Sequence, residues 1–424
     1  MAQILFGLMG LAGLLGIAWL FSDHRRCIDW RLVGIGLALQ LLLASFVLLT
    51  PWGAQIFGVV SAGFVKLLSF THQGTRFVLG DLADMQKFGF VFAFQALPIL
   101  IFFAALTSVL YHFGVMQMLV SGMAWGITRL MRVSGAETLS VCANAFVGQT
   151  EAPLVVKPYI ATMTASELLT LMVGGMATIA GSVMGAYVTM LGGSDPQAQA
   201  YFARHLITAS LMAVPATLVI AKILCPETAE PLTRGQVRIA VEKTAANAID
   251  AAAAGAAEGL KLAANVGAML LAFIALIALI DAPLGWMGDL TGLNALLGHD
   301  LSLTLVFGYL MAPIAWLIGV PWVDAVNVGS LLGVKIVLNE FVAYSQLAKM
   351  QDGLSPTSTV IATYALCGFA NFSSIAIQLG GIGGIAPERR SDLAQLGLKA
   401  VLGGVLATLM TATIAGVLTS LGAG

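Results

Sequence analysis

Charge is scarce in this sequence. Asp, Glu, Lys and Arg make up only 10% of its 424 residues, against about 25% in an ordinary soluble domain. The 20 basic and 21 acidic residues nearly cancel, leaving a formal net charge of -1, so the chain has no basic surface that would attract DNA or RNA. These shortages exclude a soluble enzyme and predict that no nucleic acid is among the partners.

Cysteine and histidine patterns are also missing. The four cysteines are far apart and form no C-x-x-C pair, and the five histidines show no H-E-x-x-H spacing. We therefore expect no disulfide framework and no structural metal. An intramembrane enzyme would need a nucleophile or a metal set, and the chain has no G-x-S-x-G motif, so we predict that it is not an enzyme.

Long apolar runs dominate instead, because 59% of the residues are apolar. Runs near the roughly 20 residues that a helix needs to cross a bilayer fall at residues 4–21, 32–49, 90–110, 168–191, 206–224, 263–280, 358–379 and 398–421. Apolar segments that look interfacial or re-entrant fall at residues 56–70, 115–131, 136–159, 303–317 and 321–347. The sequence thus predicts an all-α polytopic membrane protein with eight transmembrane helices, two re-entrant helical hairpins and interfacial helices.

The first apolar run and the basic residues predict the orientation. Residues 4–21 lack a basic segment before them and an A-x-A-like site after them, so we expect this span to be retained. Cytoplasmic ends of spans carry the excess of Lys and Arg, and most of the 20 basic residues lie on the cytoplasmic side if both termini lie outside. We therefore predict that both termini lie outside.

A polar, Ala-rich stretch at residues 226–258 reads as a cytoplasmic connection between two halves that repeat one plan. In the first half, a hairpin candidate at 144–153 precedes a helix interrupted at 174–182; in the second half, residues 338–344 precede an interruption at 367–376. An odd number of spans separates corresponding elements, which is typical of the inverted repeats of secondary transporters. We expect the two polar breaks to meet near the middle of the membrane.

Two carboxylates lie inside the apolar stretches, Glu151 and Glu340. A charge at the bilayer centre costs at least about 2.5 to 3.5 kcal/mol, which favours a functional role over a structural hydrogen bond, although both interpretations remain open. Neutral donors and acceptors stand beside them, namely Gln149, Thr150, Asn371, Ser373 and Ser374. Such a set suits a polar uncharged solute, because an anion would need Arg or Lys here.

The first break also carries oxygen ligands. Unwound helix segments free backbone carbonyls that can coordinate a small cation, and Asn144, Val147, Thr178 and Ile179 surround this break. Oxygen ligands suit a hard ion, and the pattern leaves both sodium and a proton open.

The order of these motifs resembles a known family. The runs at residues 148–153, 339–344 and 368–375, together with residues 90–98, are similar to the signatures of the concentrative nucleoside transporters in their short bacterial form, and the likeness covers essentially the whole chain. The resemblance implies a homotrimer in the lipid bilayer of the cell inner membrane. Each protomer would have a scaffold domain and a transport domain that carries substrate by an elevator-like movement.

The resemblance also implies where the scaffold and the transport domain lie. Residues 1–112 would be mainly scaffold helices, and residues 113–225 the first transport-domain repeat, with a hairpin at 136–159 and a broken helix at 166–191. Residues 226–280 would be the cytoplasmic connection and the sixth helix, which belongs to the scaffold. The second transport-domain repeat would be residues 281–424, with a hairpin at 321–347 and a broken helix at 357–379.

A set of substrate-binding residues follows from the same resemblance. The nucleobase would be bound through the first hairpin, by Gln149 and Thr150, with Glu151 helping directly or through water and with Val183 lining the pocket. The ribose would be bound through the second half, by Glu340, Asn371 and Ser374, with Phe369 packing near the nucleoside.

Sodium would lie between the first hairpin and the broken helix. Its ligands would be Asn144, Val147, Thr178 and Ile179, with Val147 and Ile179 acting through their backbone carbonyls. The function implied is a symporter, with sodium favoured as the coupling ion, that concentrates nucleosides such as uridine. A proton-coupled nucleoside symporter and a symporter for another polar uncharged solute remain alternatives, while two hairpins that break near the midplane argue against a passive channel.

Overall fold

The computed structural model describes residues 2–235 and 245–422, and within these ranges the chain forms helices and turns with one isolated β-bridge between Ser134 and Arg234. The all-α class predicted from the sequence is confirmed. Part of the predicted connection at 226–258, residues 236–244, lies outside the described residues.

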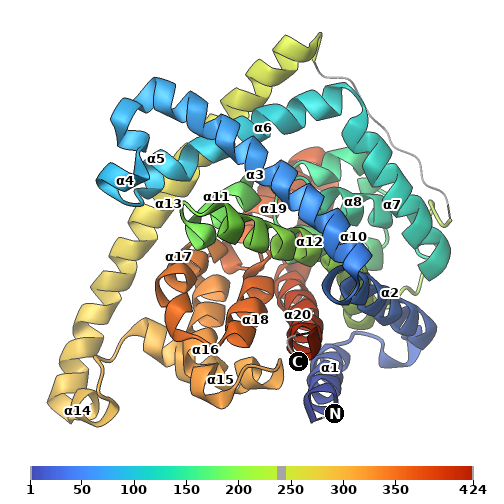
Figure 1. Cartoon of the computed structure of the whole chain (residues 1–424). Helices are drawn as coiled ribbons and strands as arrows, with labels where there is room; N and C mark the ends of the chain where they lie inside the picture. Colours follow the sequence, from blue (N-terminus) through green and yellow to red (C-terminus); the bar gives the residue numbers. More distant parts are fainter. Residues whose placement is uncertain (1, 236–244, 423–424) are drawn as a thin grey trace.

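The first part of the chain supplies peripheral helices (Figure 1). Their bounds are α1 (Ala2–Leu20), η1 (Arg25–Cys27), α2 (Trp30–Leu49), α3 (Pro51–Leu79), η2 (Gly80–Ala83), α4 (Met85–Phe88), α5 (Phe92–Gln95), α6 (Leu97–His112) and α7 (Val115–Met131). Side-chain caps fix where two of them begin. Asp29 accepts hydrogen bonds from the first backbone amides of α2, and Thr50 accepts one from Gly53 ahead of α3, whose first residue is Pro51.

A hairpin, a broken helix and a long helix follow in the first half. They are α8 (Gly135–Asn144), η3 (Ala152–Val156), α9 (Lys157–Ile160), α10 (Ala165–Ala177), α11 (Gly181–Gly192) and α12 (Pro196–Leu224). Ser134 with Glu137, and Thr164 with Glu167, form capping boxes that start α8 and α10. The helical path from α10 to α11 is interrupted at residues 178–180, inside the predicted interruption.

One 44-residue helix, α13 (Ala248–Thr291), connects the halves and is followed by α14 (Leu293–Leu297). Gly255 and Gly259 let α13 approach α6 closely, because a Cβ at Gly255 would stand 2.7 Å from the Ala104 carbonyl oxygen and one at Gly259 2.7 Å from Ile101 Cα. This is the small-residue spacing that brings membrane helices together. Most of the remaining surface of α13 is not covered by this chain.

The second half repeats the order of the first. Its elements are α15 (Leu303–Leu317), α16 (Trp322–Val337), α17 (Glu340–Met350), η4 (Gln351–Gly353), α18 (Pro356–Leu366), α19 (Phe372–Ile385), η5 (Pro387–Arg389) and α20 (Arg390–Gly422). The chain turns by 116° between α15 and α16. Asn339 caps α17 and Asn371 caps α19, so both breaks of the second half end at an asparagine.

The core of the protein lies in the two repeats. The most apolar stretch of each long helix shows this difference. In the broken helix of α10 and α11 and in α12, 89% of that stretch is buried, and in α20 83% is buried. In α1 the buried share is 22%, and in α13 it is 11%. The long helices α12 and α20 pack against each other and against both α10 and α18. The two broken helices are therefore held from both sides by long continuous helices.

Two predicted segments differ in extent from the helices of the structure. Eight described helices are long and apolar enough to cross a membrane, the number expected, but their membership differs. Residues 56–70 were expected to be interfacial or re-entrant; they belong to α3, a continuous helix of 29 residues whose length and composition would also allow it to cross a membrane, and its interfacial placement stays a prediction. Residues 358–379 were expected to form a span interrupted at 367–376. The interruption is confirmed and covers residues 367–371, so α18 and α19 are each too short to count among the eight.

Candidate functional site

The two broken helices contact each other at their breaks. The Phe369 amide in the second break donates a hydrogen bond to the Thr178 carbonyl oxygen in the first break, at 3.3 Å. Gly368 permits this approach, because a Cβ there would stand 2.8 Å from the Met176 carbonyl oxygen. The breaks therefore meet, as the sequence predicts, and unpaired ends of four half-helices converge at one place.

A buried carboxylate lies at this meeting point. Glu340 is the first residue of α17 and is 3% exposed. Its Oε1 accepts a hydrogen bond from the Tyr187 hydroxyl of α11 at 2.9 Å, and its Oε2 accepts one from Asn371 Nδ2 at 3.2 Å. One carboxylate thus joins the second hairpin, the second break and a helix of the first repeat.

The hydrogen bonds continue from Asn371 into the first hairpin. Asn371 Oδ1 accepts from the Ser374 amide at 2.9 Å, and the Ser374 hydroxyl accepts from Gln149 Nε2 at 3.2 Å. Gln149 Oε1 in turn accepts from Gln378 Nε2 at 3.1 Å. We call this continuous set the inter-repeat chain; its members are Tyr187, Glu340, Asn371, Ser374, Gln149 and Gln378.

The other expected substrate residues lie outside the inter-repeat chain. Thr150 packs against α19, where a Cβ at Gly381 would stand 3.0 Å from its methyl group. Val183 is buried in the first turn of α11, and Phe369 is half-buried in the second break. Glu151 is exposed, and its carboxylate folds back over Gly148 in the same hairpin.

The residues expected to hold sodium surround the first break. Asn144 ends α8, its Nδ2 donates to the Ser140 carbonyl at 3.2 Å, and its buried Oδ1 has no hydrogen-bond partner among the described residues. The Thr178 hydroxyl donates to the Gly174 carbonyl at 2.9 Å and keeps its lone pairs as acceptors. Gly174 separates the two side chains, since a Cβ there would stand 3.5 Å from Asn144 Nδ2.

This donor set fits a hard cation. A buried acceptor without a donor is costly, and Asn144 Oδ1 is such an acceptor. Neutral amide, hydroxyl and carbonyl oxygens are the ligands that hard cations prefer. Asn144, Thr178 and the carbonyls of Val147 and Ile179 are the groups at this break that would hold such an ion.

Sequence reasoning missed two members of the inter-repeat chain, Tyr187 and Gln378. Tyr187 lies 153 positions before its partner Glu340, and Gln378 lies 229 positions after its partner Gln149. Gln378 did carry a signal, because it is the single amide side chain in α19 and apolar residues flank it on both sides; the structure buries it fully. Tyr187 carried none, since a tyrosine in an apolar run reads as core; its ring does stack on that of Tyr344, with centroids 4.3 Å apart.

The whole chain matches proteins that carry nucleosides across membranes. The family described as Na+ dependent nucleoside transporter N-terminus matches residues 9–82, and the one described as Na+ dependent nucleoside transporter C-terminus matches residues 205–416. The family described as nucleoside recognition matches residues 93–194. The nucleoside permease NupC of Helicobacter pylori is 40% identical over 99% of both chains. Sodium/nucleoside cotransporter 1 of Mus musculus is 41% identical over 96% of this chain and 63% of its own.

Solved structures agree over the same length. CNTnw in an inward-facing substrate-bound state has a TM-score of 0.89 and 44% identity, covering 100% of this chain and 99% of CNTnw. A CNTnw variant in an outward-facing state has a TM-score of 0.91 and 42% identity, covering 99% and 98%. The fold is thus one that is seen open to either side, and its relatives are transporters, not enzymes. The chain belongs to the Na+ dependent nucleoside transporter family.

Proposed function

We propose that this protein is a sodium-coupled symporter that concentrates nucleosides such as uridine into the cell by an elevator-type movement. The observation that carries the proposal is the inter-repeat chain, in which buried amides, a hydroxyl and a carboxylate from both repeats converge where the two helix breaks cross. Neutral donors and acceptors around one carboxylate match the hydroxyls of a ribose and the amide-like edge of a nucleobase.

The substrate would bind by replacing bonds within the inter-repeat chain. The 3.2 Å bond between Gln149 and Ser374 is a link between the repeats made by side chains alone, so a nucleoside between them can give each a new partner without unfolding a helix. In this arrangement Gln149 and Thr150 meet the base, with Glu151 acting directly or through water and Val183 lining the pocket. Glu340, Asn371 and Ser374 meet the ribose, and Phe369 packs beside the nucleoside.

Sodium would couple to this site through the first hairpin. The proposed ligands Asn144 and Val147 lie at the end of α8, a few residues before Gln149, while Thr178 and Ile179 lie in the break. A cation bound between them fixes the loop that presents Gln149 to the substrate. Sodium then raises nucleoside affinity, and by linkage the nucleoside raises sodium affinity by the same factor.

The moving body would consist of the two repeats, residues 113–225 and 281–424. The strong burial of α10, α11, α12 and α20 supports this division, because these helices pack on each other and can shift as one unit. The scaffold would comprise residues 1–112 and 226–280, whose long helix α13 leaves most of its surface free to meet lipid or another protomer. We place the protein in the cell inner membrane as a homotrimer with both termini outside.

Uptake of labelled uridine into proteoliposomes tests the proposal. An imposed inward sodium gradient should drive accumulation, and an inside-negative potential should increase it, since one charge moving through 100 mV gains about 2.3 kcal/mol, or roughly 50-fold accumulation. Accumulation driven by a proton gradient alone would replace sodium with a proton. Flux that only equilibrates uridine under every gradient would refute coupling, and no uridine flux would refute the substrate.

A further inference from the structure

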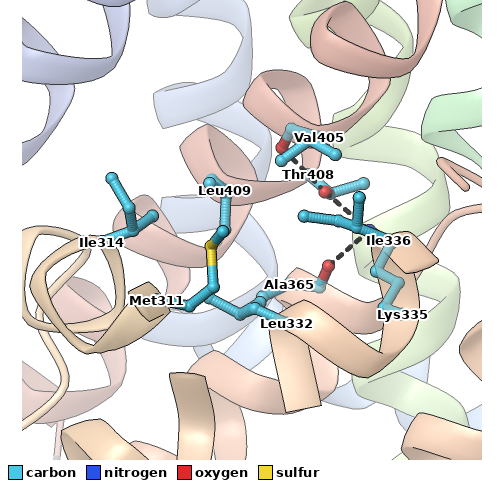
Figure 2. A pocket seen from close by; sticks show the side chains of 9 residues that line it. All are labelled: Met311, Ile314, Leu332, Lys335, Ile336, Ala365, Val405, Thr408 and Leu409. Carbon is cyan, nitrogen blue, oxygen red and sulfur yellow. Dashed lines mark hydrogen bonds between the residues drawn. The ribbon is translucent and has the colours of Figure 1, made fainter. Parts of the chain in front are cut away.

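A buried lysine lies near the second break and takes no part in the proposed substrate site. Lys335 stands in the last turn of α16 and is 1% exposed. Its Nζ donates to the Ala365 carbonyl oxygen at 2.7 Å and to the Thr408 hydroxyl at 3.0 Å. Figure 2 shows these two oxygens converging on the Lys335 side chain from α18 and α20.

The surroundings of this ammonium are apolar. The small cavity beside it, about 20 Å³, is lined mainly by the side chains of Met311, Ile314, Leu332, Val405 and Leu409 (Figure 2). Among the described residues, no carboxylate oxygen lies within 4.0 Å of its nitrogen. A methionine would fill this space without the cost of taking an unpaired charge out of water, so packing alone does not explain a lysine here.

The position of Lys335 matches that of Asn144 in the first repeat. Asn144 lies in the first helix of its hairpin, five residues before Gln149, and Lys335 lies in the first helix of its hairpin, five residues before Glu340. Asn144 faces the break that follows α10, and Lys335 reaches the last turn of α18, directly before the second break. Both side chains thus lie between the end of a hairpin helix and the end of the next half-helix.

The two positions differ in whether their polar groups already have partners. Near the first break, Asn144 Oδ1 is buried without a donor. Near the second break, the corresponding gap is already bridged, because the Ala365 carbonyl, one of the last in α18, receives the lysine ammonium. A cation is favourable there, since helix C-terminal carbonyls carry partial negative charge.

We propose that the Lys335 ammonium is a built-in cation that takes, in the second repeat, the place that the coupling sodium takes in the first. This inference rests on the proposed sodium site. The second break, with Phe369 and Asn371, then keeps its unwound shape whether or not sodium is bound. Only the first hairpin responds to the ion, and Lys335 is a positioning residue that acts on the substrate through this break.

Removing the amine and returning it in free form tests the proposal. Lys335→Ala deletes three carbons and the nitrogen, which are the heavy atoms of n-propylammonium. At saturating sodium, we expect uridine to bind the purified Lys335→Ala protein at least tenfold more weakly than the wild type, and n-propylammonium to restore at least half of this loss on a logarithmic scale. The neutral n-propanol should restore none, and Lys335→Met, which fills the space, should not be rescued.

Matched controls separate the charge from packing. Lys349→Met removes an exposed lysine of the same hairpin and should leave uridine affinity within twofold of the wild type. If Lys335→Ala is not a folded protein by size-exclusion chromatography, Lys335→Gln is compared with Lys335→Met, because Gln keeps a donor without the charge. Equal losses of at least tenfold support the built-in cation, whereas wild-type affinity in Lys335→Gln means that a neutral donor suffices and overturns it.

The remaining outcomes distinguish failure of this inference from failure of the proposed function. Wild-type affinity in Lys335→Ala, rescue by n-propanol as strong as by the amine, or no rescue by either overturns the inference. The proposed function fails separately, if the wild-type protein binds uridine equally with and without sodium. A wild type with sodium-dependent binding and Lys335 variants that behave contrary to expectation would refute the inference alone.

Discussion

In the first repeat, a hairpin formed by α8, η3 and α9 precedes the broken helix of α10 and α11 and the long helix α12; in the second repeat, α16 and α17 precede α18 and α19 and then α20. Hydroxyl side chains start the broken helix in both repeats, Thr164 before α10 and Ser355 before α18. The two repeats thus share their element order, and their breaks contact each other. The repeats differ in the side chains that line those breaks.

The first repeat is neutral at its break and leaves Asn144 Oδ1 without a donor. The second repeat carries a carboxylate and an ammonium, and both are matched inside the chain, Glu340 by Tyr187 and Asn371, and Lys335 by Ala365 and Thr408. A buried charge is tolerated only when its partners are fixed. In our proposal, the difference means that the first break needs a bound cation, whereas the second break already has one in the Lys335 ammonium.

Glu340→Gln in the second repeat should have the largest effect on uridine binding. Both carboxylate oxygens accept hydrogen bonds, and an amide group replaces one acceptor with a donor that faces Tyr187 or Asn371. We expect uridine to bind about 1.5 to 3 kcal/mol more weakly, or roughly ten- to a hundredfold. Isothermal titration with uridine, 2'-deoxyuridine and 3'-deoxyuridine on both proteins measures the loss.

The analogues decide what Glu340 contacts. If the carboxylate binds a ribose hydroxyl, the analogue without that hydroxyl binds the wild type less well and loses much less on substitution. Tyr187→Phe is the matched control, because it removes one donor to the same carboxylate and keeps the ring; it should cost about 0.5 to 1.5 kcal/mol equally for all three ligands. Equal losses of all three ligands in Glu340→Gln would mean that this carboxylate only fixes the hairpin.

Much of the fold was predictable, because a helix that crosses a bilayer needs a long apolar run, which the sequence shows directly. Apolar runs and their polar interruptions located the helices and both breaks, and four residues singled out for the substrate, Gln149, Glu340, Asn371 and Ser374, are joined by hydrogen bonds. The extent of α3 was not predictable in this way. Polar residues such as Gln73 and Arg76 interrupt its apolar run, yet the helix continues to Leu79 and ends at Gly80, which has a φ of 58°.

The rest of the site depends on contacts between residues far apart in the sequence, which a local sequence pattern does not predict. Tyr187 and Gln378 reach their partners only because the breaks cross, and crossing is a property of the packed core. The same limit applies to the exact extent of the second break, which was expected at 367–376. The sequence located its polar residues, but the five non-helical residues at 367–371 follow from Asn371 starting a new helix and from Gly368 touching α10.

Gly368→Ala should disturb the crossing itself, with a smaller effect. A Cβ at Gly368 would stand 2.8 Å from both the Met176 carbonyl oxygen and the Thr408 methyl group, and the backbone of α10 cannot yield cheaply. We expect a cost of about 1 to 3 kcal/mol, seen as a lower thermal unfolding temperature of the purified protein. Gly380→Ala is the matched control in α19, where an added Cβ meets nothing within 4 Å; equal shifts in both variants would contradict the close crossing.

Thr178→Ala tests the proposed sodium site of the first repeat and should have the smallest effect. It removes one proposed sodium ligand without adding bulk, so the sodium concentration for half-maximal uridine uptake should rise roughly two- to tenfold, a cost of about 0.5 to 1.5 kcal/mol, while the limiting rate falls less. Thr189→Ala is the matched control, because Thr189 is equally buried and its hydroxyl donates to the Gly185 carbonyl at 3.0 Å, four residues back, as Thr178 donates to Gly174. Thr189 lies in α11 beyond the break, so its loss should leave the sodium dependence unchanged. An unchanged sodium dependence in Thr178→Ala, or the same shift in both variants, would remove Thr178 from the sodium site and leave the unpaired Asn144 oxygen to be explained by another ligand.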